Sequence, residues 1–147
     1  MDYARLDEAL RPLLDKFYRN QRSAMRGVPG AQAWVARAGD IVAALNLAPV
    51  PGGYWLTGLL VAENQRRQGI AHTLLGHALA TCDGPTWLFC HPDLIGFYQP
   101  LGFTTCTALP PALAERLKRY QRTKELVALQ APAAGLAYLS SGNSTSV

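Results

Sequence analysis

The apolar residues of this chain follow two different periods. Near the start they recur at helical spacing with charged residues between them, at Leu6, Leu10, Leu13, Leu14 and Phe17. A stripe of this kind predicts an amphipathic helix. After a Gly/Pro patch, residues 33–36 and 41–47 read as two strands joined through Gly39-Asp40, a dipeptide typical of hairpins. A turn at 49–53 and a strand at 54–61, rich in aromatic and aliphatic residues, follow.

The period then returns to helical. Ile70, Leu74 and Ala78 lead an apolar stripe that predicts a helix from about Gly69 to Cys82, ended by the Asp-Gly-Pro that follows it. The elements expected after it are a strand at 86–90, a short helix at 93–99, a strand at 103–107, a surface helix at 111–122 and a strand at 125–130. A strand–helix–strand unit in one sheet is normally parallel, so the order predicts an α/β domain with a mixed sheet.

Length and composition fit one packed domain. The 147 residues are 49% hydrophobic and 16% charged, so we expect a single domain over residues 1–130. The uncharged tail at 131–147 is expected to be loose. Two long uncharged stretches, residues 41–62 and 94–114, are interrupted by Pro and Gly. They therefore read as buried strands and turns, and no membrane association is expected.

Charge and cysteine content narrow the classes of partner. The net charge of +4 favours a polyanionic ligand but also occurs on ordinary surfaces. No basic run with interleaved aromatic residues appears, so nucleic acid is not an expected partner. Three cysteines without paired spacing, and an acidic start without an apolar run, indicate a cytoplasmic protein. His72 and His77 are five residues apart and do not share a helix face, so no metal site is expected.

The most informative segment joins the strand ending near Val61 to the helix after it. Free N–H groups at a helix start, with the helix dipole behind them, attract anions. Gly69 in the first turn would let a ligand approach the backbone closely, and Arg66 and Arg67 add donors for phosphate oxygens. Neither GxxxxGK[ST] nor GxGxxG occurs. On these residues alone, a phosphate-binding loop and a tight loop with two solvated arginines remain equally open.

Two motifs then resemble one family. The run Arg66-x-x-Gly69-x-Ala71 resembles the [Q/R]-x-x-G-x-[G/A] signature of the GNAT superfamily of N-acetyltransferases, after a strand ending like that family's. The segment FYQPLGF at residues 97–103 resembles the family's FYxxLGF, in the right order. The expected elements up to Gln130 also follow the family's order. The resemblance implies a GNAT-like mixed, mostly antiparallel sheet with a strand–helix–strand cofactor-binding unit and flanking helices.

The resemblance also implies acetyl-CoA as co-substrate and direct transfer of the acetyl group to a primary amine. The pyrophosphate of coenzyme A would lie on the backbone N–H groups of Arg66, Arg67, Gln68, Gly69, Ile70 and Ala71. The pantetheine arm would pair with the backbone of Leu59, Leu60 and Val61. One backbone N–H of that strand would polarise the acetyl carbonyl.

The same resemblance places catalytic candidates. Tyr98 would occupy the family's general-acid position and protonate the departing thiolate; the alternative is an aromatic core residue. Glu63 is the candidate base, against a water-relayed base or none. His91 falls where many members carry an asparagine that contacts the cofactor arm. It could donate a hydrogen bond there, act as a base, or cap the short helix beginning near Pro92.

The acceptor and the reaction itself are the most open points. In the family the opening helix and the loop after it line the acceptor side, here residues 16–30. Arg19, Arg22 and Arg26 in this segment favour an acceptor that bears a carboxylate or phosphate over a polyamine. The alternative to an enzyme is a non-catalytic acyl-CoA-binding or regulatory interaction module with the same fold, for which a homodimer is one arrangement.

Overall fold

The structure is a computed structural model that describes residues 1–134. The chain divides into two compact units, the first made of residues 1–49 and 55–81 and the second of residues 50–54 with the chain from residue 82 onward. Within residues 1–134, no helix has both the length and the hydrophobicity needed to cross a bilayer.

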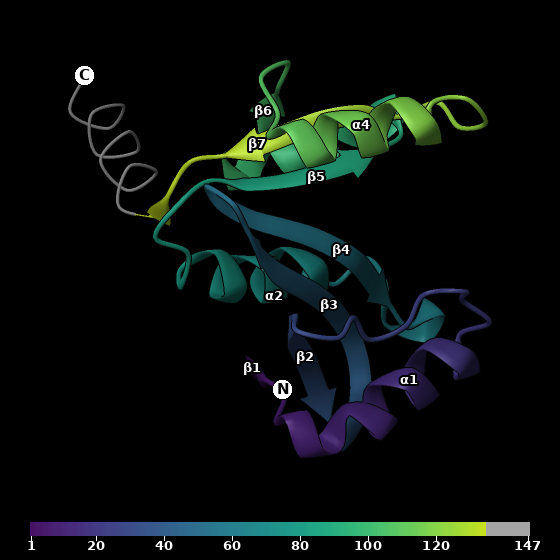
Figure 1. Ribbon diagram of the computed structural model, residues 1–147. Helices are drawn as coiled ribbons and strands as arrows, with labels where there is room; N and C mark the ends of the chain where they lie inside the picture. Colours follow the sequence, from purple (N-terminus) through teal and green to yellow (C-terminus); the bar gives the residue numbers. More distant parts are fainter. Residues whose placement is uncertain (135–147) are drawn as a thin grey trace. The chain divides into compact units, whose positions relative to one another are not determined.

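The first unit is a strand layer flanked by helices (Figure 1). Its strands, in their order across the layer, are β1 (Asp2–Arg5), β2 (Gln32–Ala38), β3 (Asp40–Val50) and β4 (Gly53–Val61). β2 runs antiparallel to both β1 and β3. The helices are η1 (Glu8–Leu10), α1 (Arg11–Asn20), η2 (Glu63–Gln65) and α2 (Ile70–Leu79). α2 packs against β1 and β2. The ring of Tyr3 on β1 stacks on the ring of His77 on α2, with 5.4 Å between the ring centroids.

The core of this unit corrects the predicted opening helix. The buried side chains of α1 are Leu14, Phe17 and Tyr18, which share a cluster with Val35 of β2. Leu10 and Leu13 of the expected stripe are 37% and 40% exposed, and Leu6 lies before η1. The helix begins only at Arg11 because Pro12 lacks an N–H and is tolerated in the first turn of a helix alone. The buried face of the helix therefore starts at Leu14, while Leu6 of the predicted stripe is buried in the same cluster but lies before the helix.

The second unit holds three further strands, β5 (Thr86–Cys90), β7 (Val127–Ala131) and β6 (Thr104–Thr105), in that order and antiparallel. Its helices are η3 (Pro92–Leu94), α3 (Ile95–Tyr98), η4 (Gln99–Leu101) and α4 (Pro111–Tyr120). α4 lies along β5 and β7 (Figure 1), where Phe89 and Tyr120 meet edge to face at 6.4 Å. The Tyr54 N–H donates to the Pro85 carbonyl oxygen at 2.9 Å, which attaches residues 50–54 to this unit.

The predicted fold class is confirmed. Residues 1–134 contain seven strands, mostly antiparallel, with flanking helices. Several elements differ from the prediction: β1 was not predicted, the strand expected at 103–107 has only two residues, and the helix expected from about Gly69 to Cys82 spans Ile70–Leu79. β7 ends at Ala131, one residue inside the expected tail. Residues 135–147 of that tail lie outside the described residues, so its looseness and the single domain over residues 1–130 stay predictions.

Candidate active site

β4 changes character at its centre. Trp55 and Leu56 are buried, whereas every residue from Thr57 to Val61 is only partly buried. Gly58 sits at the change with a φ of +69°, a left-handed conformation that interrupts the regular strand and marks a bulge. Leu59, Leu60 and Val61, the residues expected to contact the pantetheine arm, are thus partly accessible to solvent.

A buried polar network holds this bulge, and sequence reasoning missed it. The Tyr18 hydroxyl donates to the Gly58 carbonyl oxygen at 2.7 Å. The Asn46 Nδ2 donates to the Tyr18 hydroxyl oxygen and to the Arg26 carbonyl oxygen, both at 3.3 Å. Tyr18 is 0% and Asn46 2% exposed, and burial raises the pKa of Tyr18 well above its usual range. The sequence signals that could have found it were a glycine inside a strand and an asparagine inside an otherwise apolar one.

The turn between η2 and α2 has the geometry of an anion site. Gly69 is the N-cap of α2 with a φ of +75°, rather than a residue of its first turn, and Arg67 is also left-handed with a φ of +66°. Ile70 and Ala71 lie in the first turn of α2, where a backbone N–H has no carbonyl of an earlier helical turn to accept it. A Cβ built at Gly69 would meet nothing within 4 Å. Helix-start amides facing open space are suited to binding phosphate oxygens.

The two arginines of this turn, Arg66 and Arg67, differ in their contacts and in their backbone conformation. The Arg66 Nε donates to the Val61 carbonyl oxygen at 3.1 Å, which ties the turn to the end of β4. Both arginine side chains are exposed. Arg66 therefore shapes the turn as well as contributing charge, while Arg67 contributes its guanidinium from an unusual backbone conformation.

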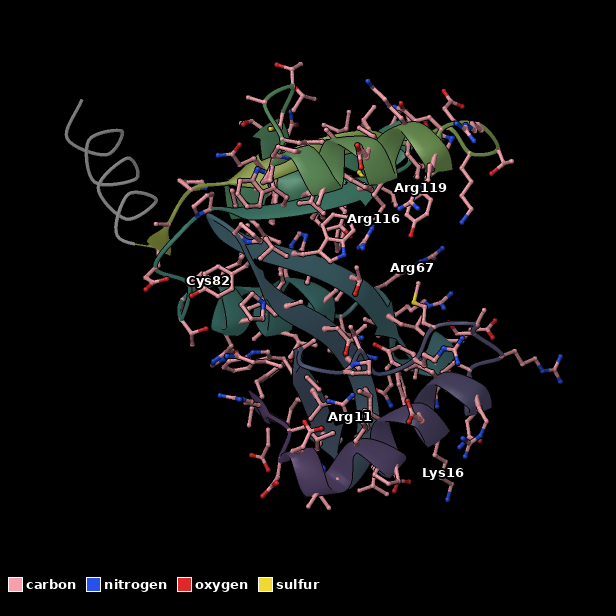
Figure 2. All side chains as sticks on the ribbon, in the orientation of Figure 1. Arg11, Lys16, Arg67, Cys82, Arg116 and Arg119 are labelled. Atoms are coloured by element: carbon pink, nitrogen blue, oxygen red, sulfur yellow. The ribbon has the colours of Figure 1, made fainter. Side chains whose placement is uncertain are left out.

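Glu63 lies at the start of η2 and is exposed. Its N–H donates to Oε1 of Gln21, at the end of α1, at 3.2 Å. Beside it is a hollow of about 440 Å³ lined by α1, the end of β2, the start of β3 and the three residues Ala62, Asn64 and Gln65, with Lys16 among its charged side chains. Figure 2 shows Lys16 projecting outward from α1. Glu63 is thus held next to solvent at the end of β4, in a place a proton acceptor can occupy.

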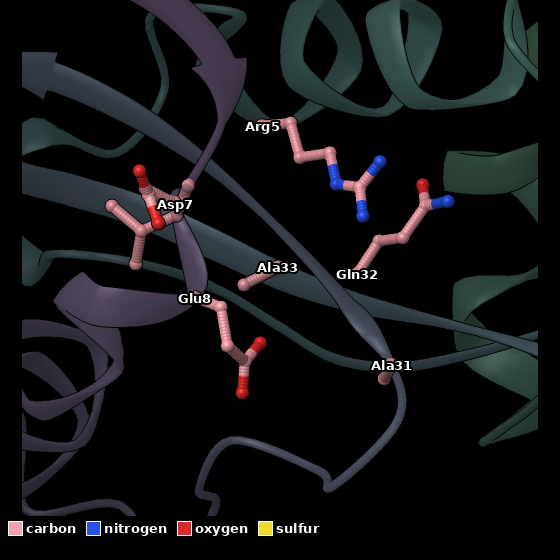
Figure 3. Close-up of a pocket in the computed structure, with 7 residues that line it drawn as sticks. Arg5, Asp7, Glu8, Ala31, Gln32 and Ala33 are labelled. Atoms are coloured by element: carbon pink, nitrogen blue, oxygen red, sulfur yellow. The ribbon is translucent and has the colours of Figure 1, made fainter.

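A second hollow, of about 390 Å³, lies between the end of β1, η1 and the start of β2. Figure 3 shows Arg5 and Gln32 extending in the same direction from the two strands, with Glu8 on η1. Charged groups of both signs line it. None of the residues assigned from sequence lies in this hollow.

Tyr98, in the second unit, is packed among aromatic rings. It meets Phe97 edge to face at 4.9 Å and Phe103 at 5.6 Å, and only 9% of it is exposed. Burial, followed by the neighbouring Cys90 of β5, raises the pKa of Tyr98 to about 12. A phenol in this environment keeps its proton at neutral pH. The packing matches the core alternative, and the held proton is what a general acid needs.

His91 caps the short helix η3. Its Nδ1 accepts the Asp93 N–H at 3.0 Å, so the capping interpretation is confirmed. An accepting Nδ1 in a neutral ring leaves the proton on Nε2, and Nε2 lies 3.4 Å from a Glu125 carboxylate oxygen. Both ring nitrogens therefore already face groups of the protein, and a contact to a cofactor stays a prediction.

Known structures share this architecture. An acetyltransferase of the GNAT family from Staphylococcus aureus Mu50 is 15% identical with a TM-score of 0.65, covering 90% of this chain and 98% of that chain. The ribosomal-protein-S18-alanine N-acetyltransferase from Escherichia coli is 16% identical with a TM-score of 0.63, covering 90% and 94%. Rv2747 from Mycobacterium tuberculosis, in complex with CoA and NLQ, is 12% identical with a TM-score of 0.65, covering 90% and 99%. The fold is therefore the GNAT fold.

Sequence comparison identifies the family. Residues 29–105 match the family described as acetyltransferase (GNAT) domain. This segment is more than half of the 147 residues, and the chain belongs to the GNAT family. No curated protein sequence matches it.

Proposed function

We propose that this protein is an N-acyltransferase that uses acetyl-CoA and transfers the acetyl group directly to a primary amine. The observation that carries the proposal is the turn before α2. The N–H groups of Ile70 and Ala71 open a helix and have no intrahelical acceptor, and the space at Gly69 is open. Those two properties fit the diphosphate of coenzyme A, because a diphosphate needs several converging donors and a close backbone approach.

The partly exposed end of β4 fits the rest of the cofactor. An extended pantetheine arm can hydrogen-bond to strand backbone, as an added strand does. Residues 59–61, which follow the Gly58 bulge, are only partly buried. A backbone N–H of this stretch would donate to the oxygen that becomes negative during attack, which is the most effective place for a fixed donor. The bound thioester supplies the electrophilic carbonyl carbon.

Two proton transfers accompany the reaction, and residues of the protein would take part in both. As the new C–N bond forms and the C–S bond breaks, the Tyr98 hydroxyl would give its proton to the departing sulfur, a role worth about 10²–10⁴ in rate for a well-placed acid. The ammonium proton of the acceptor must leave before attack, and Glu63 or a water beside it would accept it. Positioning the amine and thioester together would supply much of the remaining acceleration.

The acceptor side favours an anionic substituent. Arg19, Arg22 and Arg26 are all exposed on α1 or the loop after it, and no acidic residue lies between Asp15 and Asp40. A polycationic amine would be repelled by this surface, whereas an amine with a carboxylate or phosphate would be attracted. None of the three cysteines, all within residues 1–134, is part of a disulfide, which supports a reducing compartment, and we place the reaction in the cytoplasm.

The test is release of free coenzyme A, followed with a thiol reagent, across a panel of amines. We expect turnover with at least one carboxylate- or phosphate-bearing amine, and Tyr98→Phe should slow it about 10²-fold while coenzyme A still binds. A preference for polyamines would overturn the acceptor assignment. Calorimetric binding without release for any amine would favour the non-catalytic acyl-CoA-binding or regulatory module, alone or as a homodimer. No heat with coenzyme A would overturn the proposal.

A further inference from the structure

The network beneath β4 has a defined direction. Tyr18 has one hydroxyl proton, and at 2.7 Å it is given to the Gly58 carbonyl oxygen. The hydroxyl oxygen in turn accepts one Asn46 Nδ2 proton, and the other goes to the Arg26 carbonyl oxygen. Because that carbonyl can only accept, the amide of Asn46 must present its nitrogen to it. Every proton in the chain of hydrogen bonds is thus assigned, ending on Gly58.

This network fixes one peptide plane. The C=O and N–H of a trans peptide point in opposite directions, and residues 1–134 contain no cis peptide. A Gly58 carbonyl held against Tyr18 therefore points the Leu59 N–H away from Tyr18. Tyr18 and Asn46 also pack closely against the Cα of Gly58. A Cβ at this position would lie 2.8 Å from the Tyr18 hydroxyl and 2.9 Å from Asn46 Nδ2.

We propose that Tyr18 and Asn46 are positioning residues that aim the Leu59 N–H at the thioester carbonyl of the bound acyl-CoA. The inference rests on the proposed function and specifies which backbone donor serves it. It also gives Asn46 a second task, because the same amide holds the Arg26 carbonyl and so ties the arginine-bearing acceptor loop to the strand that polarises the thioester.

Fixing a buried peptide this way has a clear chemical advantage. A donor aimed in advance at a developing oxyanion needs no reorganisation during the reaction. Without the Tyr18 hydroxyl the Gly58 carbonyl has no partner in this network, and the Gly58–Leu59 peptide can rotate. The hydrogen bond from Leu59 to the thioester oxygen strengthens as the reaction proceeds, so weakening it should lower kcat rather than substrate binding.

The experiment compares Tyr18→Phe and Asn46→Leu with Tyr54→Phe. The control removes a tyrosine hydroxyl that donates to Asp83 at 2.7 Å and shares no hydrogen bond with the network. We expect Tyr18→Phe to lower kcat about 10-fold or more, with the KM for acetyl-CoA changed less than about 3-fold. The infrared band of the ¹³C=O of bound acetyl-CoA should move to higher frequency in Tyr18→Phe and Asn46→Leu. Tyr54→Phe should change neither kcat nor the carbonyl frequency.

A measurement on the unaltered protein needs no variant to fold. The Leu59 amide proton resonance should move downfield with acetyl-CoA and less with coenzyme A, which lacks the carbonyl. A Leu59 amide that responds equally to both, or a folded Tyr18→Phe with unchanged kcat and carbonyl frequency, would overturn the positioning role while leaving the proposed function intact. Absence of acetyl-CoA binding to the unaltered protein would remove the proposed function, and this role with it.

Discussion

At the scale of single residues, Gly58 combines two demands that only glycine meets together. Its φ of +69° is left-handed, and its Cα faces Tyr18 and Asn46 too closely for a methyl group. The first demand alone costs a side chain about 1–2 kcal/mol. The second adds the strain of overpacking a buried site, typically about 1–3 kcal/mol.

We therefore expect Gly58→Ala to lower the free energy of unfolding by about 2–5 kcal/mol, measured by urea denaturation. Gly30→Ala is the matched control, because Gly30 has a φ of +81° but nothing within 4 Å of its Cβ position. It should lose only the conformational part, about 1–2 kcal/mol. Equal losses in the two variants would show that the space at Gly58 relaxes freely.

These residues also show a limit of sequence reasoning. Tyr18, Asn46 and Gly58 are separated by 28 and 40 residues in the pairs that contact each other, so no local pattern joins them. Tyr18 was not part of the predicted apolar stripe, because tyrosine carries a polar hydroxyl and its sequence position does not show that the ring is buried. Arg66, Gly69 and Ala71, by contrast, form a local motif, and the structure places them on one turn.

At the scale of elements, a substitution in the turn before α2 should affect coenzyme A binding more than it affects stability. Gly69→Ala should lower the free energy of unfolding by only about 1–2 kcal/mol, since its φ of +75° is strained for alanine but its Cβ position is open. Its affinity for coenzyme A should fall about 10-fold or more, since the methyl group would occupy the space proposed for the diphosphate. Calorimetry and urea denaturation give the two numbers.

The control for this variant is Gly39→Ala, in the hairpin between β2 and β3, with a φ of +82° and an equally open Cβ position. It should show the same loss of stability and unchanged affinity for coenzyme A. If Gly69→Ala binds coenzyme A as tightly as the unaltered protein, the diphosphate does not lie on this turn.

The short helix η3 depends on its cap. His91→Ala removes the acceptor of the Asp93 N–H and should lower the free energy of unfolding by about 0.5–1 kcal/mol. His91→Asn should restore most of it, because asparagine is a strong N-cap residue. Thermal denaturation measures both. A drop in coenzyme A affinity that His91→Asn repairs, beyond the change in stability, would support the predicted cofactor contact.

At the scale of the whole molecule, the order of elements was predictable, whereas several of their boundaries were not. Apolar periodicity located β2, β3, β4, α2 and β5 because the sequence of each carries an apolar run or stripe. β1 was not predicted because three of its four residues are exposed and its sequence shows no alternation of apolar and polar residues. β6 was expected to be longer than its two residues, Thr104 and Thr105, both of which are exposed. Pairing with β7, not local sequence, decides where such a strand ends.

The two buried tyrosines give the molecule a common response to alkali. Burial raises the pKa of Tyr18 and raises that of Tyr98 to about 12. In the unfolded chain both hydroxyls ionise near their ordinary value of about 10. The folded protein therefore binds more protons than the unfolded chain once the pH exceeds about 10. This contribution to stability is complete below that pH and is lost as the pH rises towards the folded pKa values.

The free energy of unfolding should accordingly fall as the pH rises between about 10 and 12, by on the order of 2 kcal/mol for Tyr98 alone. Urea denaturation across this range, with tyrosinate absorbance followed in parallel, measures it. Tyr98→Phe should flatten the decline, whereas Tyr120→Phe, which removes a tyrosine that is 41% exposed, should leave it as it is. A Tyr98→Phe protein with the full decline would mean that Tyr98 ionises in the folded state as readily as in the unfolded chain. It would then lack the firmly held proton on which its proposed role as the acid depends.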